Sequence, residues 1–226
     1  MNNRKIHLLV ESVVKLVLLL ISIGVILFGS AGTLRFINGW IAIGMLLVPV
    51  IISGAFFYFK NPEMLKRRVT HREQNERQKA LIAMCTVIFA LGLVASGLSY
   101  RFSFLTLPVF CLPIGFVIYL FSLILYCLAY SANPFLSKAV LIQDAQYVVD
   151  TGIYGKLRHP FYLATTLFYF SISIALNSIL TMAVFVLYIP VLNRRIVLEE
   201  AYLKSELPGY EEYMKKVPYR LIPNLW

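Results

Sequence analysis

Two polar clusters could do chemistry in a chain that is otherwise mostly apolar. The first is the segment 152–162, GIYGKLRHPFY, in which Arg158 and His159 stand directly before Pro160. Proline is favoured in the first turn of a helix, where its missing N–H would have no partner. The free N–H groups and the dipole of such a helix start favour an anion. This segment is therefore a candidate ligand site.

The second cluster is the segment 194–200, RRIVLEE, in which Arg195 and Glu199 are four residues apart. Residues at this spacing share a helix face, and an ion pair within the helix would account for them. The functional alternative is a charge couple that faces the same cavity as His159. A tight turn at Asn177 would place both clusters at the same end of two antiparallel helices. That geometry favours the functional alternative.

The composition of the chain indicates that membrane helices position these clusters. Hydrophobic residues make up 59% of the 226 residues and charged residues 14%, whereas soluble globular proteins have about 25% charged residues. A spanning helix needs about 20 apolar residues. The sequence predicts an all-α, polytopic membrane helix bundle of about six spanning segments, the last two forming a tight helical hairpin. The corresponding apolar runs are 13–28, 40–59, 80–98, 105–129, 161–176 and 179–191.

The distribution of basic residues predicts the orientation of the bundle. Six spans put both termini, the loops 60–79 and 133–160 and the C-terminal segments on one side, and these parts carry most of the Lys and Arg residues. Basic loops favour the cytoplasm, so we expect both termini and the candidate site there, with Arg35 and Arg101 on the opposite side. The net charge of +10 is accordingly interpreted as a signal of topology and of contact with membrane lipid, and no nucleic-acid partner is predicted.

We expect a single membrane domain over 1–226, with a four-span part at 1–132 and a cofactor-binding and catalytic part at 133–226. The long polar connection 133–162 favours this division, because such a connection in a small membrane protein is usually functional or ordered by a ligand. The charged loop 61–79 is interpreted as a solvated connector that lies against anionic lipid.

Several kinds of site are absent from the sequence. Cys85, Cys111 and Cys127 lie in apolar runs without metal-ligand spacing, so they are assigned to the core and no metal site is expected. There is no G-x-G-x-x-G motif and no P-loop, so neither a Rossmann dinucleotide site nor a Walker nucleotide site is indicated. There is also no G-x-S-x-G nucleophile elbow.

The order of the polar motifs resembles one family of membrane enzymes. The motifs are IQ, then QYVVDTGIYGKLRHPFY, a helical hairpin, RIVLEEAYL, and GYEEYMKKVPYRLIP. This order is similar to that of the isoprenylcysteine carboxyl methyltransferase family, and related phospholipid methyltransferases have similar patterns. The resemblance implies a multispan membrane enzyme that binds S-adenosylmethionine and methylates a carboxylate, or another nucleophile, on a lipophilic or prenylated acceptor.

By position, the resemblance also implies the site residues. Arg195 matches an arginine that orients the substrate, and Glu199 matches a carboxylate that contacts the cofactor, so these two residues are the predicted catalytic pair. The chain departs from the family at Ile153, where proline is common, at Ala164, where glycine is common, and at Gln146, where eukaryotic members often have histidine. The implied cofactor-binding residues are Gln143, Gln146, Tyr147, Val148, Val149, Tyr154, His159, Pro160, Phe161, Tyr162 and Glu199.

The chemistry of the acceptor separates the possible activities. Methyl transfer requires positioning and exclusion of water, and a carboxylate acceptor is already ionised at neutral pH. Arg195 would hold such a carboxylate through two hydrogen bonds. An amine acceptor would need a base, either His159 or Glu200. Carboxyl O-methylation is the leading prediction. The alternatives are a phospholipid N-methyltransferase, an NADPH-dependent membrane reductase of the sterol-reductase type, and a non-catalytic transporter or scaffold.

Overall fold

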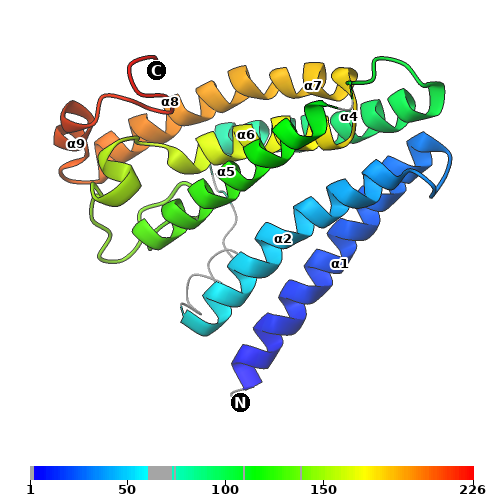
Figure 1. Ribbon diagram of the computed structural model, residues 1–226. Helices are drawn as coiled ribbons and strands as arrows, with labels where there is room; N and C mark the ends of the chain where they lie inside the picture. The colour runs from blue at the N-terminus through cyan, green and yellow to red at the C-terminus, as the bar shows by residue number, and fades with distance from the viewer. Residues whose placement is uncertain (1–2, 61–72, 74, 109, 138) are drawn as a thin grey trace.

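The computed structural model describes residues 3–60, 73, 75–108, 110–137 and 139–226, and over these residues the chain is helical with no β-strand. The predicted all-α class is therefore confirmed (Figure 1). Most of the charged connector predicted at 61–79 lies outside the described residues. The helices are α1 (Asn3–Ala31), α2 (Ile37–Lys60), α4 (Glu76–Phe102), α5 (Cys111–Ala132), the 3₁₀ turn η1 (Gly152–Gly155), α6 (Pro160–Ala175), α7 (Ile179–Val186), α8 (Tyr188–Glu206) and α9 (Tyr210–Lys216).

The lengths of these helices fit a multi-pass membrane protein. In the described part of the chain, five apolar segments are long enough to cross a membrane. The remaining predicted span, the fifth at 161–176, corresponds to α6, which is apolar but has 16 residues. At 1.5 Å per residue it extends about 24 Å, less than the ~30 Å hydrocarbon core of a bilayer. The five long segments are Leu9–Ala31, Ile37–Phe59, Glu76–Phe102, Cys111–Ala132 and Ile179–Glu206.

The tight hairpin predicted after α6 is present. Asn177 adopts a left-handed conformation with φ of 56°, and its side-chain oxygen accepts a hydrogen bond from the Leu107 N–H at 3.0 Å. The next residue, Ser178, caps α7 by accepting from the Thr181 N–H at 3.0 Å. These bonds satisfy polar backbone groups at the turn and reverse the chain within two residues.

The second arm of the hairpin is divided into α7 and α8 at Leu187. Pro190 accounts for the break, because a proline ring clashes with the carbonyl four residues earlier and removes a helical hydrogen bond. That carbonyl belongs to Val186, the last residue of α7. The kink predicted at Pro190 is therefore located one helical turn before the proline.

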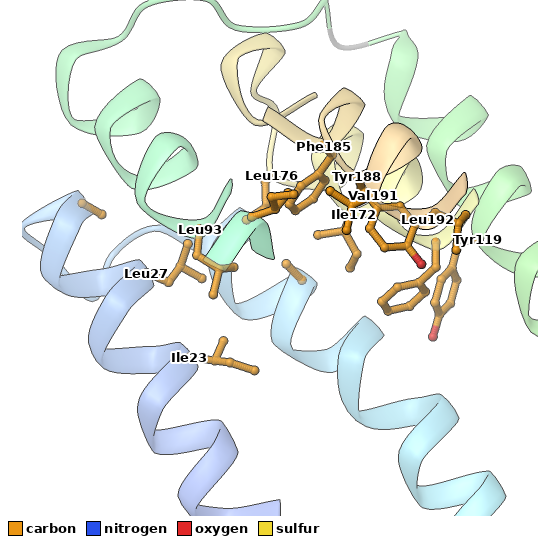
Figure 2. Packing of buried hydrophobic residues seen from close by; sticks show 14 of the residues in the cluster. Ile23, Leu27, Leu93, Tyr119, Ile172, Leu176, Phe185, Tyr188, Val191 and Leu192 are labelled. Atoms are coloured by element: carbon orange, nitrogen blue, oxygen red, sulfur yellow. The ribbon is translucent and has the colours of Figure 1, made fainter. Parts of the chain in front are cut away.

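The helices pack through apolar faces that meet near α6. α5 runs along α6, α4 contacts α1, α7 and α8, and Figure 1 shows α1 and α2 as a pair of neighbouring helices. Figure 2 shows the side chains where these helices meet, among them Leu27 of α1, Leu93 of α4, Ile172 of α6 and Phe185 of α7. The α1–α4 contact depends on Gly97, since a Cβ atom there would lie 2.7 Å from the backbone nitrogen of Ala31.

Polar side chains order the connection between α5 and α6. The buried Glu73 carboxylate accepts a hydrogen bond from the Val140 N–H at 2.9 Å, which ties the connection to the start of α4. Gln143 donates from its side-chain amide to the Phe135 carbonyl at 2.6 Å. Its own backbone N–H donates to the Gln146 side-chain oxygen at 2.8 Å. The connection therefore holds its shape through its own amides.

The C-terminal segment returns to the start of α6. The N–H groups of Arg158 and His159 donate to the carbonyls of Tyr219 at 3.0 Å and Arg220 at 2.9 Å. Figure 1 shows α9 and the C-terminal segment at the same end of the molecule as the end of α8 and the α5–α6 connection. The two polar clusters of the sequence therefore lie at this end, together with the C-terminal segment.

Candidate active site

A cavity of about 530 Å³ lies where α4, the α5–α6 connection, the start of α6, α8 and α9 meet. Ten of the residues implied by the family resemblance contribute to its wall: Gln146, Tyr147, Val148, Val149, Tyr154, His159, Phe161, Tyr162, Arg195 and Glu199. His159 and Glu199 thus face one cavity, as the hairpin geometry predicts. What these side chains bind stays a prediction.

Two of the implied residues are not part of the cavity wall. Gln143 is buried behind the connection, where its hydrogen bond to Phe135 holds the loop that carries Gln146. Pro160 is the first residue of α6 and is also buried. Their positions suggest that both residues support the wall from behind and do not contact a cofactor directly.

Tyr162 joins the predicted pair Arg195 and Glu199. Its hydroxyl donates to the Glu199 Oε2 at 2.5 Å and accepts from the Arg195 Nε at 2.9 Å. The guanidinium carbon of Arg195 also lies 5.8 Å from the centroid of the Tyr162 ring. The couple predicted from the spacing of four residues is therefore bridged by a tyrosine from α6, which fixes the two charged groups relative to each other.

His159 is held by a different carboxylate, that of Glu200. The Nε2 atom of His159 lies 3.1 Å from the Glu200 Oε1, and the imidazole stacks on the Tyr162 ring with centroids 5.6 Å apart. Arg158 and Arg220 bind the same carboxylate, with Nε–O distances of 2.7 and 2.9 Å. Glu200 was predicted only as a possible base. Its contacts with Arg158 and Arg220 could not be predicted, because neither arginine stands at a helical spacing from Glu200.

Part of the cavity wall comes from α4, which the sequence analysis did not include in the site. Ile82, Cys85, Thr86 and Phe89 lie on one face of α4 and line the cavity. Their spacing of three and four residues was visible in the sequence, but an apolar helical stripe is the ordinary pattern of a packed face. Cys85 packs against the core, as predicted, and also lines the cavity. Cys127 was assigned to the core as well, but it is exposed.

Tyrosines form the part of the wall near α9. Burial raises the pKa of Tyr154, Tyr210 and Tyr213 above the ordinary range of a phenol. The Tyr213 hydroxyl donates to the Tyr154 carbonyl at 2.8 Å. The Tyr154 hydroxyl is buried and makes no hydrogen bond of good geometry with any described residue. A buried hydroxyl of this kind at a cavity wall is suited to bind a polar ligand atom.

The cavity differs from a metal centre. Within the described ranges, no three His, Cys, Asp or Glu side chains come together in a way that could hold a metal ion. The polar groups at the wall include three carboxamide or carboxylate side chains, two arginines, a histidine and several hydroxyls, and they suit an organic ligand with both charged and aromatic parts.

A second cavity, of about 780 Å³, lies between α2 and α5 and is almost wholly apolar. Phe161 lines both cavities. The ring of Phe161 packs edge-on against Tyr126 and Tyr130, with centroids 5.2 and 5.6 Å apart. The polar cavity therefore adjoins an apolar one across a wall of aromatic rings.

Comparison with known proteins finds one family model that matches this region. A search of curated proteins finds no match to the chain. The model of the isoprenylcysteine carboxyl methyltransferase family matches residues 109–205, which run from just before α5 to the end of α8. The match contains both polar clusters and the hairpin between them. The resemblance is therefore confirmed: residues 109–205 of this chain match the model of the isoprenylcysteine carboxyl methyltransferase family.

Proposed function

We propose that this protein is a membrane methyltransferase that takes a methyl group from S-adenosylmethionine and transfers it to the carboxylate of a lipophilic or prenylated acceptor. The observation that carries the proposal is the single cavity that combines Arg195, Tyr162, Glu199 and His159 beside lipid-exposed helices. The family match supports methyl transfer, and the family name supports a prenylated cysteine carboxylate as the acceptor.

The residues of the cavity fit S-adenosylmethionine. This molecule carries a sulfonium and an ammonium cation, a carboxylate and an adenine ring, and when bound it supplies an electrophilic methyl group. Glu199 provides a carboxylate for a cationic group, and the aromatic rings of Tyr154 and Tyr210 provide faces for the adenine or the sulfonium. The Tyr154 hydroxyl, which is buried at the wall, provides a further polar atom.

The charged groups favour a carboxylate acceptor over an amine. Arg195 has five N–H donors, one of which binds Tyr162, and its guanidinium faces the cavity. A carboxylate needs no base, whereas an amine must lose a proton before it attacks. Glu200, one of the two bases considered for the amine reaction, is surrounded by the His159 Nε2 and two arginines and is not part of the cavity wall.

The protein contributes positioning and exclusion of water. The Tyr162 hydroxyl lies at hydrogen-bond distance from both Arg195 and Glu199. A ligand group bound to Arg195 therefore has a defined position relative to a group bound to Glu199. Such positioning lowers the entropy cost of bringing two reactants together. The apolar cavity behind Phe161 supports a lipophilic acceptor, because an apolar chain in it would lie beside the reacting groups.

We further propose that both termini and the cavity lie on the cytoplasmic side. The support is the concentration of Lys and Arg in the loops and C-terminal segments at this end of the bundle. The C-terminal part, 133–226, would provide the cofactor and acceptor contacts, with α4 from the N-terminal part completing the wall.

Binding of S-adenosylmethionine to the purified protein in nanodiscs tests the proposal. We expect calorimetry to show binding by the wild-type protein, and Glu199→Gln to weaken it at least tenfold. Lys204→Gln, which removes an exposed ion pair between Lys204 of α8 and Glu211 of α9, is the matched control and should bind normally. Absence of wild-type binding, or a thermal shift with NADPH but none with S-adenosylmethionine, would reject the proposal.

The product identifies the acceptor class. Radiolabelled S-adenosylmethionine, incubated with the protein and a synthetic farnesylated cysteine, should give a labelled methyl ester that mild base releases as volatile methanol. An N-methylated phospholipid retains its label under the same treatment. Label found only in base-stable lipid would replace carboxyl O-methylation with phospholipid N-methylation.

A further inference from the structure

We infer that Glu200 is a positioning residue, which orients His159 and holds the C-terminal segment against the start of α6, while its neighbour Glu199 faces the ligand. The effect on catalysis rests on the proposed methyl transfer, but the structural role of Glu200 does not. The two glutamates are adjacent in the sequence, where the family resemblance assigns a role to Glu199 alone. The role of Glu200 is inferred from its partners in the structure.

The Glu200 carboxylate joins three parts of the chain. It is 3% exposed. One of its oxygens accepts from the Arg158 Nε at 2.7 Å and lies 3.1 Å from the His159 Nε2, both at the start of α6. The other oxygen accepts from the Arg220 Nε at 2.9 Å and the Nη2 at 2.8 Å, both in the C-terminal segment. Its acceptor positions are therefore occupied by protein donors.

Glu199, by contrast, is part of the cavity wall. Successive residues of an α-helix point about 100° apart, and of these two glutamates only Glu199 belongs to the cavity wall. Glu199 is directed to Tyr162 and the cavity, and Glu200 to the arginines beside the C-terminal segment. Two neighbouring positions of α8 thus carry a ligand-facing carboxylate and a supporting carboxylate.

Glu200 also selects the form of the His159 ring. A carboxylate only accepts hydrogen bonds, so the Nε2 atom that faces it must carry the proton. In the neutral ring, Nδ1 is then the acceptor nitrogen. This arrangement is comparable to the carboxylates that orient metal-binding histidines, whose removal typically lowers activity 10- to 100-fold.

The Arg158 side chain extends the same support to the C-terminal segment. Its Nη1 donates to the Val217 carbonyl at 2.7 Å. Together with the two backbone hydrogen bonds from Arg158 and His159 to residues 219 and 220, this bond fixes the C-terminal segment beside α6. Tyr210 and Tyr213 of the cavity wall belong to the helix directly before that segment. Loss of Glu200 should therefore loosen this part of the wall as well.

The test is the tautomer of His159 in the full-length protein in nanodiscs, read from ¹⁵N chemical shifts of labelled histidine. The chain has three histidines, and His159→Gln assigns the signal. We expect one Nε2–H form in the wild type and a mixture in Glu200→Gln, with kcat/KM lowered 10- to 100-fold. Glu199→Gln should weaken donor binding and leave the tautomer unchanged. A single unchanged tautomer and normal kinetics in Glu200→Gln would overturn the inference.

If Glu200→Gln does not fold, the variant Arg220→Gln tests the structural role of Glu200. This variant keeps the Glu200 contact to His159 but releases the C-terminal segment, so amide hydrogen exchange at 217–222 should rise at least tenfold while the Nε2–H form persists. Unchanged exchange there would also overturn the inference. A wild-type protein that shows the expected tautomer but does not bind S-adenosylmethionine would reject the proposed function alone.

Discussion

At the scale of single residues, the site depends on a few hydroxyl and carboxylate groups that connect charged side chains. Tyr162 contributes most, because its hydroxyl bridges Arg195 and Glu199 and its ring stacks on His159. Removal of that hydroxyl leaves both charged groups in place but no longer fixed to each other. A loss of positioning lowers the rate of reaction more than it lowers the stability of the fold.

The variant Tyr162→Phe tests this role. We expect kcat for methyl transfer to fall 10- to 100-fold, since the reacting groups lose a defined separation, and the melting temperature to change by only a few degrees. Tyr119→Phe is the matched control, because it removes a hydroxyl that donates to the Met45 carbonyl at 3.0 Å and Tyr119 lines neither cavity. A Tyr162→Phe enzyme with wild-type kcat would show that the bridge has no part in catalysis.

The buried tyrosines near α9 predict how stability depends on pH. The pKa of Tyr154, Tyr210 and Tyr213 is raised by burial, so the folded protein keeps these protons where the unfolded chain has lost them. Above the ordinary tyrosine pKa of about 10, the unfolded state therefore binds fewer protons and the free energy of unfolding falls as pH rises. Below about pH 10, the full contribution of these three tyrosines to the free energy of unfolding is present.

Thermal unfolding between pH 8 and 11 measures this effect. We expect a constant melting temperature up to about pH 10 and a steep decline above it. Tyr210→Phe, which removes one of the three phenols, should make the decline shallower. Equal slopes for the wild type and Tyr210→Phe would show that Tyr210 ionises normally in the folded protein.

At the scale of helices, the site depends on close packing far from the cavity. α4 supplies one wall of the cavity and packs against α1 and α7. At Gly97, an added Cβ would meet the Ser30 side chain and the backbone of Ala31, and backbone atoms cannot turn aside as a flexible side chain can. The α1–α4 distance is therefore set by a glycine.

Gly97→Ala should separate α1 from α4 and lower the free energy of unfolding by about 1 to 3 kcal/mol, the usual cost of overpacking. Gly54→Ala in α2 is the matched control, since nothing lies within 4 Å of its added Cβ. Thermal unfolding in one detergent compares the two variants. Equal melting temperatures would mean that the α1–α4 contact adapts without cost.

The sequence predicts these helices better than it predicts the contacts between them. The hairpin at Asn177 follows from a two-residue interruption between apolar runs, and the shared cavity follows from the hairpin. The contacts that hold His159 could not be predicted from the sequence, because Arg220, which binds Glu200, belongs to a segment with no periodic relation to α8. The α4 wall was missed because apolar residues that line a cavity have the same pattern as residues that pack a core.

At the scale of the whole molecule, the bundle has two functionally different ends. The cavity, α9 and the C-terminal segment lie at one end. At the opposite end, the loop after α4 contacts the turn between α6 and α7 through the hydrogen bond from Leu107 to Asn177. If the helices cross a bilayer, Ser103 and Ser205 must lie on opposite sides of it, and the positive-inside rule puts Ser205 in the cytoplasm.

Thiol labelling of intact cells tests that orientation. Both serines are exposed, so each can be changed to cysteine in a background where Cys85, Cys111 and Cys127 are replaced by serine or alanine. A membrane-impermeant maleimide added outside should label Ser103→Cys and should label Ser205→Cys only after the membrane is opened. The reverse pattern would place the cavity on the outer side and reject the proposed orientation. Labelling of both sites from outside would mean that the bundle does not cross the bilayer in the proposed way.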